Sequence, residues 1–247
     1  LSRAMLYAER WEAAKIAGAK VLEIGYELTG NYADAFKTGS TEAILQYSYN
    51  KASFTHSFDA NYAPGGDRKG AGAMGTPTQE MVESYELKTI GGFPDWTAWH
   101  NTSGTNDEPP YADLEPRFQA SILYNSASWK GRKIEPFIDG TDGWASWKDD
   151  AVPAGRTVTG YFLRKMLDEN IDLSKDGSTQ PWTAFRLAEV LLNYAEACYR
   201  SNATADANAA VRKVRARVGL PYQDKSGSDL MAAIMQERKV ELAFEGF

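Results

Sequence analysis

The C-terminal stretch 186–247 constrains the fold more than any other part of the chain, because it predicts three consecutive amphipathic helices. The first helix is predicted over residues 186–200. Its apolar side chains recur at helical spacing along one face: Leu187, Val190, Leu191, Tyr194, Ala195 and Cys198. The opposite face is predicted to be polar and carries Glu189, Asn193, Glu196 and Arg200. Glu196 and Arg200 have the spacing of a favourable helical ion pair.

The second helix is predicted to begin with Asp206 as its capping residue. Gly219 can adopt the left-handed conformation that ends a helix, and Pro221 prevents its continuation. The apolar side chains of this helix also share one face: Ala207, Ala210, Val211, Val214 and Val218.

The third helix is predicted from Ser228 or Asp229 to Phe244, with Gly246 ending it. Its apolar face is predicted to comprise Met231, Ile234, Met235 and Leu242, and Arg238 lies within that face. An unpaired guanidinium there would cost several kcal/mol. We therefore predict a carboxylate partner for Arg238, from the candidates Glu241, Glu189 and Glu196. A functional anion site is the alternative interpretation.

These helices carry a family resemblance. The segments RLAEVLLNYAEA (186–197), VRKVRARVGLP (211–221) and IMQERKVELAFEG (234–246) resemble, in the same order, the C-terminal region of the SusD/RagB family. The similarity extends to PTQEMVESYE (77–86), YADLEPRFQASILYN (111–125), YFLRK (161–165) and LYAERWEAAKIAGAKVLEIGYEL (6–28). The resemblance implies a mainly α fold of tetratricopeptide-like helical hairpins, with long irregular loops and a few short strands.

Members of that family are lipid-anchored proteins of the bacterial outer membrane. They bind glycans beside a TonB-dependent transporter of the SusC type. The resemblance therefore implies an oligosaccharide or polysaccharide ligand, a SusC-like partner, a location at the cell surface and no catalytic activity. By the same comparison, we expect the chain to lack an N-terminal portion, including the lipid anchor, and a C-terminal portion.

The predicted organisation is a single SusD-like domain fragment. It comprises a helical hairpin at 1–28, a loop-rich ligand-binding region at 29–180, and a C-terminal helical hairpin plus helix at 181–247. In the first hairpin, small residues allow close helix packing along a face formed by Trp11, Ala14, Gly18, Val21 and Leu22. Within the middle region we expect a helical turn at 32–36, strands at 44–49 and 133–138, a loop at 60–78, a helix at 78–88, a strand or helix at 118–124, and an extended segment at 160–167.

Composition excludes several classes of function. The 247 residues include 27 basic and 33 acidic ones, for a net charge of −6. Without a basic run, the chain lacks a surface for nucleic acid. Cys198 is the single cysteine, which excludes an internal disulfide and a thiolate metal cage. We expect it to be a small buried hydrophobic residue; a catalytic nucleophile is the remote alternative. No segment has the length and hydrophobicity of a membrane-spanning helix.

Two irregular loops rich in tryptophan are the candidate ligand site. Aromatic faces can stack on the C–H faces of sugar rings, while neighbouring polar side chains bind the hydroxyl groups. The candidate glycan contacts are Asp95, Trp96, Trp99, His100, Asn101, Trp144 and Trp147. Asp142 and Lys148 offer further polar contacts. The alternative interpretation is that these tryptophans pack the loops against the scaffold.

Other signals do not define a site. The sequence beginning at Asp139 resembles a calcium loop, but Trp144 occupies the position where an EF-hand requires glycine. No signature identifies a pair of glycosidase carboxylates. His56 and His100 are isolated, and we interpret both as hydrogen-bonding groups of loops. No cofactor or metal is predicted. Two alternative functions remain: a tetratricopeptide-like scaffold that binds a protein, and a glycoside hydrolase.

Overall fold

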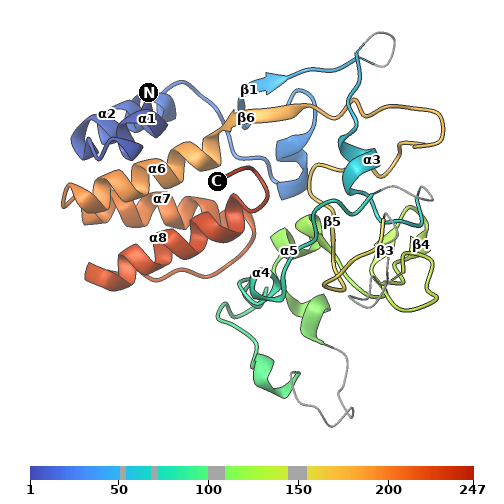
Figure 1. Cartoon of the computed structure of the whole chain (residues 1–247). Helices are drawn as coiled ribbons and strands as arrows, with labels where there is room; N and C mark the ends of the chain where they lie inside the picture. Colours follow the sequence, from blue (N-terminus) through green and yellow to red (C-terminus); the bar gives the residue numbers. More distant parts are fainter. Residues whose placement is uncertain (51–53, 68–71, 100–108, 144–154) are drawn as a thin grey trace. The chain divides into compact units, whose positions relative to one another are not determined.

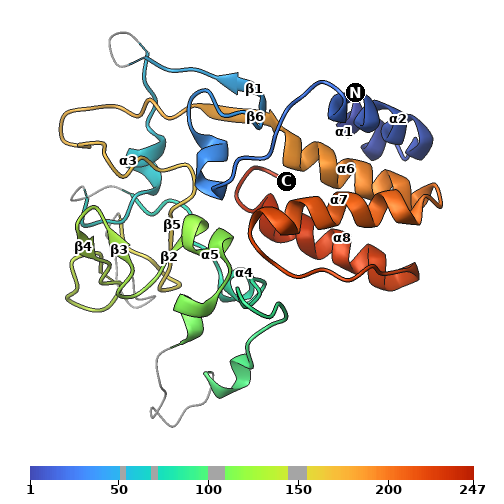
Figure 2. The ribbon, with the colours of Figure 1, turned by 180° about the vertical axis from the view of Figure 1, so that it is seen from behind.

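The computed structural model describes residues 1–50, 54–67, 72–99, 109–143 and 155–247, and its chain forms two compact units (Figures 1 and 2). We call them the helical unit and the loop unit. The helical unit consists of Leu1–Gln46, Glu83–Arg117 and Thr183–Phe247. The loop unit consists of Tyr47–Val82 and Phe118–Trp182. Among the described helices, none combines the length and the apolar character needed to cross a membrane.

The helical unit contains the four longest described helices and a short N-terminal helix. They are α1 (Ser2–Tyr7), α2 (Trp11–Leu22), α6 (Leu187–Arg200), α7 (Thr204–Arg217) and α8 (Gly227–Glu241). Helix α6 is the central element, because α1, α2, α7 and α8 all pack against it (Figure 1). The expected hairpins at both ends of the chain are therefore present.

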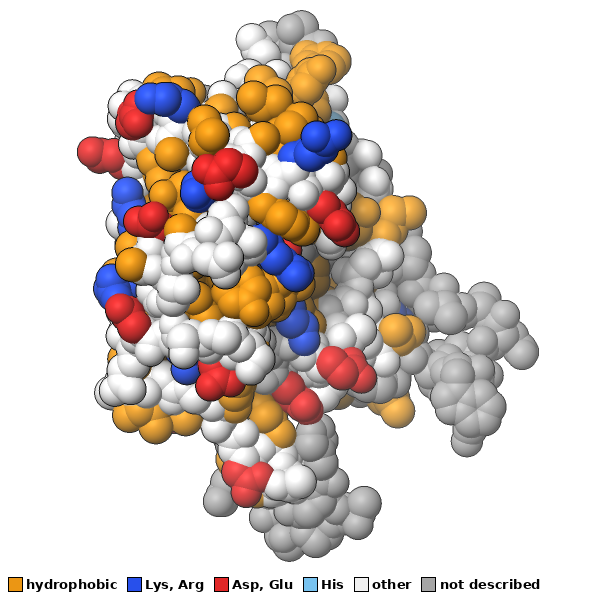
Figure 3. All heavy atoms as spheres, turned by 90° about the vertical axis from the view of Figure 1, so that its left-hand side faces the viewer, with side chains coloured by type: hydrophobic (Ala, Val, Ile, Leu, Met, Phe, Trp, Pro, Cys, Tyr) orange, Lys and Arg blue, Asp and Glu red, His pale blue; other side chains and the backbone are white. Residues whose placement is uncertain are grey.

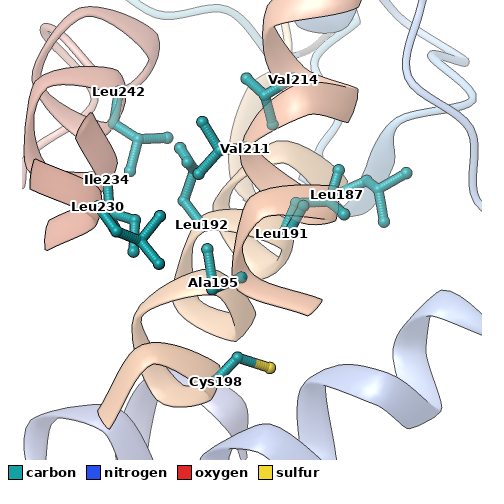
Figure 4. Close-up of a cluster of buried hydrophobic side chains, with 12 residues drawn as sticks. Leu187, Leu191, Leu192, Ala195, Cys198, Val211, Val214, Leu230, Ile234 and Leu242 are labelled. Carbon is teal, nitrogen blue, oxygen red and sulfur yellow. The ribbon is translucent and has the colours of Figure 1, made fainter. Parts of the chain in front are cut away.

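The predicted apolar stripe of α6 forms the main core of this unit. Leu187, Leu191, Ala195 and Cys198 are buried, and side chains from α7 and α8 meet them in one cluster (Figure 4). The described members of that cluster are Leu187, Leu191, Leu192, Ala195, Cys198, Ala207, Ala210, Val211, Val214, Leu230, Ile234 and Leu242. Cys198 is thus a buried hydrophobic residue, as predicted, and burial raises the pKa of its thiol to about 11.

The opposite face of α6 is polar, as predicted, but part of it is buried. Glu196 and Arg200 form the expected pair, at 3.9 Å. Glu189 and Asn193, two of its four polar residues, are buried. They lie where α1 and α8 pack on α6, and Arg3 of α1 donates to Glu189 through Nε at 2.5 Å.

Arg238 obtains an amide partner in place of the predicted carboxylate. Its Nη1 donates to Oδ1 of Asn193 at 2.7 Å, and Nδ2 of Asn193 donates to Oε1 of Glu189 at 3.0 Å. Glu189, one of the three candidates, is therefore linked to Arg238 through the amide, because Arg3 already occupies the carboxylate.

The helix boundaries also require corrections. Helix α7 begins at Thr204 without a side-chain cap, so Asp206 lies in its first turn and is not the capping residue. Gly219 adopts a φ of +72°, as predicted for the end of α7. Helix α8 ends at Glu241, three residues before the predicted end, and Phe244 adopts a left-handed φ of 66°. This backbone conformation cannot continue a right-handed helix.

The buried face of α8 is rotated from the predicted one. Ile234 and Leu242 are buried as expected, but Met235 is 49% exposed. Two glutamates, Glu237 and Glu241, occupy the buried face together with Leu230. These two carboxylates are therefore among the buried charges of this unit that need partners.

A buried charge cluster satisfies them. It consists of Arg117, Arg186, Arg215, Arg217, Glu42, Glu86, Glu115, Glu237, Glu241 and Glu245, whose side chains are each at most 10% exposed. Glu241 contacts Arg117 at 3.1 Å, Arg186 at 2.7 Å, and Arg217. Burial opposes the charge of Glu241, but these guanidinium groups outweigh it and hold the pKa of the carboxyl well below its usual value.

A second part of the cluster joins Arg215 and Glu86. The guanidinium binds both carboxylate oxygens, at 2.7 and 2.9 Å. Although burial opposes ionisation of Glu86, the bonds from Arg215 and from the backbone of Gly92 lower the pKa of this carboxyl.

The surface of the molecule on the side of the long helices carries charges of both signs. Acidic and basic side chains are interspersed there among apolar ones (Figure 3).

Close packing between α2 and α6 depends on Gly18. A Cβ atom at this position would lie 3.1 Å from Cβ of Tyr194 and 3.2 Å from its ring. Gly18 is buried, and its missing side chain allows the two helices to approach, as predicted.

Short elements complete the helical unit. The expected turn and strand are η1 (Tyr32–Phe36) and β1 (Ala43–Tyr47), and β1 pairs with β6 (Trp182–Arg186). Two further 3-10 turns are η2 (Trp96–Ala98) and η3 (Pro110–Asp113). The predicted helix at 78–88 shortens to α4 (Gln79–Val82), because Leu87 instead bridges to Leu114 in extended conformation.

The loop unit is built from short pieces. Its elements are α3 (Phe58–Tyr62), α4, α5 (Pro116–Ser121), β2 (Ile122–Leu123), β3 (Ser128–Trp129), β4 (Arg132–Lys133) and β5 (Phe162–Leu163). Strand β2 pairs with β5 and β3 with β4, both antiparallel. The region 118–124 thus contains both a helix and a strand. The predicted strand at 133–138 is reduced to β4, since Pro136 cannot donate to a ladder.

The core of the loop unit is separate from that of the helical unit. Its buried members are Ala63, Leu123, Ala127, Trp129, Ile134, Phe162, Leu167, Ile171 and Leu173. Trp129 is 1% exposed, and its Nε1 donates to Asp67 at 2.8 Å. This tryptophan therefore has a packing role, and it holds β3 to the loop that contains Asp67.

Candidate functional site

An aromatic hollow in the loop unit is the best candidate for a ligand site. Its volume is about 250 Å³, and five of its lining side chains are aromatic rings: Tyr49, His56, Phe58, Tyr62 and Trp182. Ser57, Asn61, Met166, Gln180 and Pro181 complete the lining. We refer to this site as the aromatic hollow.

A backbone bridge between His56 and Ser178 frames the hollow. Their main chains exchange two hydrogen bonds, at 3.0 and 2.9 Å. The ring of His56 is fixed on both sides: Nδ1 accepts from the backbone N–H of Phe58 at 3.1 Å, and Nε2 lies 2.8 Å from the carbonyl oxygen of Gln180. An accepting Nδ1 requires the proton on Nε2. His56 is thus a hydrogen-bonding group of a loop, as predicted.

The segment before β6 is shaped to hold α3 in place. Ser178 is buried, and its Oγ accepts from the backbone N–H of Asp59, in the first turn of α3, at 3.0 Å. A Cβ atom on Gly177 would lie 2.4 Å from Oγ1 of Thr55, so only glycine permits this close approach. The segment around Thr55 and Asp59 is therefore held against the segment of Gly177 and Ser178, although the two are far apart in the sequence.

The rings form a continuous aromatic surface. The centroids of Phe58 and Tyr62 are 4.6 Å apart, those of Tyr49 and His56 are 4.4 Å apart, and Trp182 lies 6.3 Å from Phe58. Phe54 stacks on Tyr49 with an interplanar angle of 8°. Trp182 is 39% exposed, so part of its indole is accessible to a ligand. Such a surface can stack on sugar rings, with the amides of the lining available for hydroxyl groups.

The described part of the first tryptophan loop shows a mixed arrangement. Trp96 is buried, at 9% exposure, and its Nε1 has no hydrogen-bond partner among the described residues. Asp95 is exposed, and its Oδ1 accepts from the backbone N–H of Thr97 at 3.1 Å, which caps η2. Trp99 is half-buried. The structure brings these residues together at η2, and their contact with a glycan stays a prediction.

Four other predicted contacts lie outside the described residues: His100, Asn101, Trp144 and Trp147. Lys148 also lies outside them. Asp142 is described, and its role differs from the expected one. It is buried, forms an ion pair with Arg132 at 2.8 Å, and accepts from the backbone N–H groups of Gly66 and Glu135. Asp142 thus organises the loop unit and offers no free carboxylate to a sugar.

A second hollow, of about 680 Å³, lies in the helical unit between α8 and the turn at 90–93. Phe93 and Tyr222 contribute rings, and the Glu86–Arg215 ion pair forms part of the wall. The hydroxyl of Tyr222 donates to Asn208 at 2.8 Å. Glu86 and Arg215 are paired with each other, and Lys225 and Asp229 also line this hollow. With two rings against the five of the aromatic hollow, it offers less surface for stacking on sugars.

Sequence reasoning missed the aromatic hollow, although a signal was present. Aromatic side chains recur at alternate positions in the segment that enters the loop unit, at Tyr47 and Tyr49 and again at Phe54, His56 and Phe58. Alternation places such side chains on one face of an extended chain. Trp182 lies far away in the sequence, and the pairing of β1 with β6 and the His56–Ser178 bridge bring its segment to the same place.

Comparison with known proteins identifies the family of this chain. The family model described as the SusD family matches residues 41–247. The chain belongs to the SusD family. No curated protein sequence matches it. The mainly helical fold with a few short strands, expected from the resemblance, is confirmed.

Solved structures of SusD-like proteins have the same fold. A SusD-like protein from Bacteroides fragilis is 26% identical, with a TM-score of 0.80, and the match covers 99% of this chain and 50% of that one. A SusD-like carbohydrate-binding protein from the same species has 22% identity and a TM-score of 0.84, covering 99% and 48%. Surface glycan-binding protein A from Bacteroides uniformis has 17% identity and a TM-score of 0.63, covering 100% and 46%. The chain spans about half the length of these structures.

Proposed function

We propose that this SusD-family chain binds a glycan in the aromatic hollow of the loop unit. The observation that carries the proposal is the combination of an accessible indole, Trp182, with the adjoining rings of Tyr49 and Phe58. Family membership supports it, as does the fold shared with proteins that are described as carbohydrate- or glycan-binding. Two or three stacking contacts of about 1 kcal/mol each, with hydrogen bonds, correspond to affinities of about millimolar to micromolar.

Affinity electrophoresis through gels that contain polysaccharide tests this function. We expect the 247-residue chain to be retarded by at least one glycan. Tyr49→Ala and Trp182→Ala should each weaken the interaction about tenfold, since a lost stacking contact is worth about 1.4 kcal/mol at most. Phe137→Ala is the control, because Phe137 is 49% exposed in the same unit and does not line the hollow. Absence of retardation in every gel would refute the proposal.

The tryptophan loops are separate candidate contacts. In the first loop, Asp95, Trp96 and Trp99, with His100 and Asn101, are the proposed glycan contacts. Trp144 and Trp147 are the candidates in the second loop. Full binding by Trp96→Ala and Trp99→Ala variants would exclude the first loop from the site.

The biological role that fits a weak glycan contact is capture followed by release. The chain then delivers an oligosaccharide or polysaccharide to a SusC-like TonB-dependent transporter at the outer membrane, and a lipid anchor holds the protein at the cell surface. Family membership supports this assignment. Co-purification of the protein with such a transporter from outer-membrane fractions tests it, and recovery only in the soluble fraction would contradict it.

Binding without cleavage distinguishes this role from a glycoside hydrolase. We expect no release of reducing sugar when the protein is incubated with any polysaccharide that retards it. The competing role, a tetratricopeptide-like scaffold for a protein partner, predicts no glycan retardation at all.

A further inference from the structure

The aromatic hollow is lined by uncharged side chains. Among the described residues that line it, none is Asp, Glu, Lys or Arg. The polar side chains of the lining are the hydroxyls of tyrosine and serine, the amides of Asn61 and Gln180, and the ring of His56. These groups can exchange hydrogen bonds with sugar hydroxyls, but none of them balances a ligand's negative charge.

The ring nitrogens of His56 are occupied by the backbone. Its Nδ1 accepts from the N–H of Phe58, and its Nε2 donates to the carbonyl of Gln180. Both ring nitrogens are therefore engaged with the backbone, so the ring is held in place by the protein and not by a ligand.

Neighbouring charges also disfavour an anion. Helix α3, which provides Phe58 and Tyr62, carries the carboxyl group of Asp59, whose Oδ1 accepts from the N–H of Asp168 at 2.6 Å. The adjoining surface hollow contains one lysine, Lys175, but its ammonium lies 2.9 Å from Asp172. Its charge is thus already balanced. A carboxylate or sulfate placed against the rings would lose hydration without gaining an ion pair.

We propose that the aromatic hollow selects uncharged glycans, made of neutral hexoses or pentoses, and excludes uronic-acid and sulfated polymers. This inference rests on the proposed glycan-binding function and adds the ligand class. Anionic sugars require Arg or Lys for strong recognition, because the charge-assisted bond is what compensates for desolvation. Neutral sugars need only the stacking surface and the amide and hydroxyl groups that are present.

Affinity electrophoresis with two panels tests the selection. The neutral panel contains soluble starch, xylan and mannan, and the anionic panel contains polygalacturonate, alginate and chondroitin sulfate. We expect retardation by at least one neutral polymer. The affinity for that polymer should fall about tenfold in Trp182→Ala and in Tyr49→Ala, and it should be unchanged in Phe137→Ala. Circular dichroism of each variant verifies that it is folded. Between 50 and 500 mM NaCl the dissociation constant should change less than about twofold, since no ion pair is screened.

The outcomes separate the two proposals. Retardation by an anionic polymer that depends on Trp182 and Tyr49, and weakens in salt, overturns the selection but keeps the glycan-binding function. Neutral binding that persists in both variants overturns the hollow as the selecting site. Retardation by neither panel overturns the function itself, and the selection with it.

Discussion

Arg186 and Glu241 are buried together, with Nη1 of the guanidinium 2.7 Å from Oε1 of the carboxylate, although 55 residues separate them. Nη2 of the same guanidinium donates to the backbone carbonyl of Glu241 at 2.8 Å. The pair fixes the start of α6 to the end of α8. Arg117 and Arg217 contact the same carboxylate, so Glu241 forms ion pairs with three arginines. We expect removal of that charge to be costly.

The first prediction concerns Glu241→Gln. Loss of the carboxylate leaves buried guanidinium groups without their shared counter-charge, which should lower the free energy of unfolding by about 3–5 kcal/mol. Urea denaturation measures the change. Glu196→Gln is the matched control, because its partner Arg200 lies 3.9 Å away on the helix surface. That pair is worth about 0.5 kcal/mol or less. Equal effects of both variants would contradict the prediction.

The second prediction concerns pH. The folded-state pKa of Glu241 and that of Glu86 lie below their usual value of 4.5, so both carboxylates stabilise the fold fully above that pH. Their contribution is lost as pH falls below it. Glu115 acts in the opposite direction, since burial raises its pKa. Thermal unfolding of the wild type and of Glu241→Gln at pH 7, 5, 4 and 3 should show a gap in Tm that shrinks below about pH 4.5. A constant gap would refute this.

The third prediction concerns the carboxyl group of Asp59. Burial raises its pKa, and Oδ2 has no hydrogen-bond partner among the described residues. Because the pKa of this carboxyl is higher in the folded state than in the unfolded state, ionisation of Asp59 opposes folding. Its effect on stability is therefore most favourable below the unfolded-state pKa of 3.8, and stability is lost as pH rises through the folded-state pKa. Asp59→Asn keeps an acceptor for Asp168 and removes the charge. It should therefore raise Tm at pH 7, with a smaller gain toward pH 4.

The contrasting variant is Asp172→Asn. Hydrogen bonds from Ser174 and Lys175 lower the pKa of Asp172 to about 2, so the ionised form is favoured in the fold. This variant should lower Tm at pH 7. If both variants shift Tm in the same direction, the assignment of opposite signs is wrong.

The fourth prediction concerns the contact between α2 and α6. Gly18→Leu introduces a side chain where even a Cβ atom lies 3.1 Å from Tyr194. We expect a loss of about 1–3 kcal/mol in the free energy of unfolding, because overpacking forces the helices apart. Ala13→Leu is the control, since Ala13 is exposed on the same helix. Similar stability of the two variants would contradict the close-packing role.

The fifth prediction concerns Trp96. Because this side chain is buried, Trp96→Ala should lower the free energy of unfolding by about 3–5 kcal/mol. Trp99→Ala, at a half-buried position, should have the smaller effect. Chemical denaturation measures both. Wild-type stability in Trp96→Ala would show that the indole does not pack the loop.

Periodicity predicted the helical part of the fold well. The apolar stripes of α6 and α7 were read directly from their spacing, and Gly18 and Gly219 behave as their residue type requires. Local rules failed where a partner distant in sequence decides the outcome. Glu189 and Asn193 are polar by type, yet α1 and α8 cover them.

The candidate site could be predicted only in kind. Aromatic loops were expected in the middle of the chain, but a sequence gives no distance between Tyr49 and Trp182. The pairing of β1 with β6, the His56–Ser178 bridge and the missing side chain of Gly177 bring the two segments together. The role of Asp142 could not be predicted from the sequence for the same reason. Its carboxylate is bound by Arg132 and by the backbone N–H of Gly66, and the second of these is distant in sequence.

The buried charge cluster draws on all three segments of the helical unit: Glu42 comes from the first, Glu86 and Arg117 from the second, and Arg186 and Glu241 from the third. If any segment is absent, charges contributed by the others lose partners in a dry interior. A state in which only two of the segments are folded therefore contains unpaired buried charges, and it gains little stability over the unfolded chain. This unit should consequently unfold in a single cooperative step.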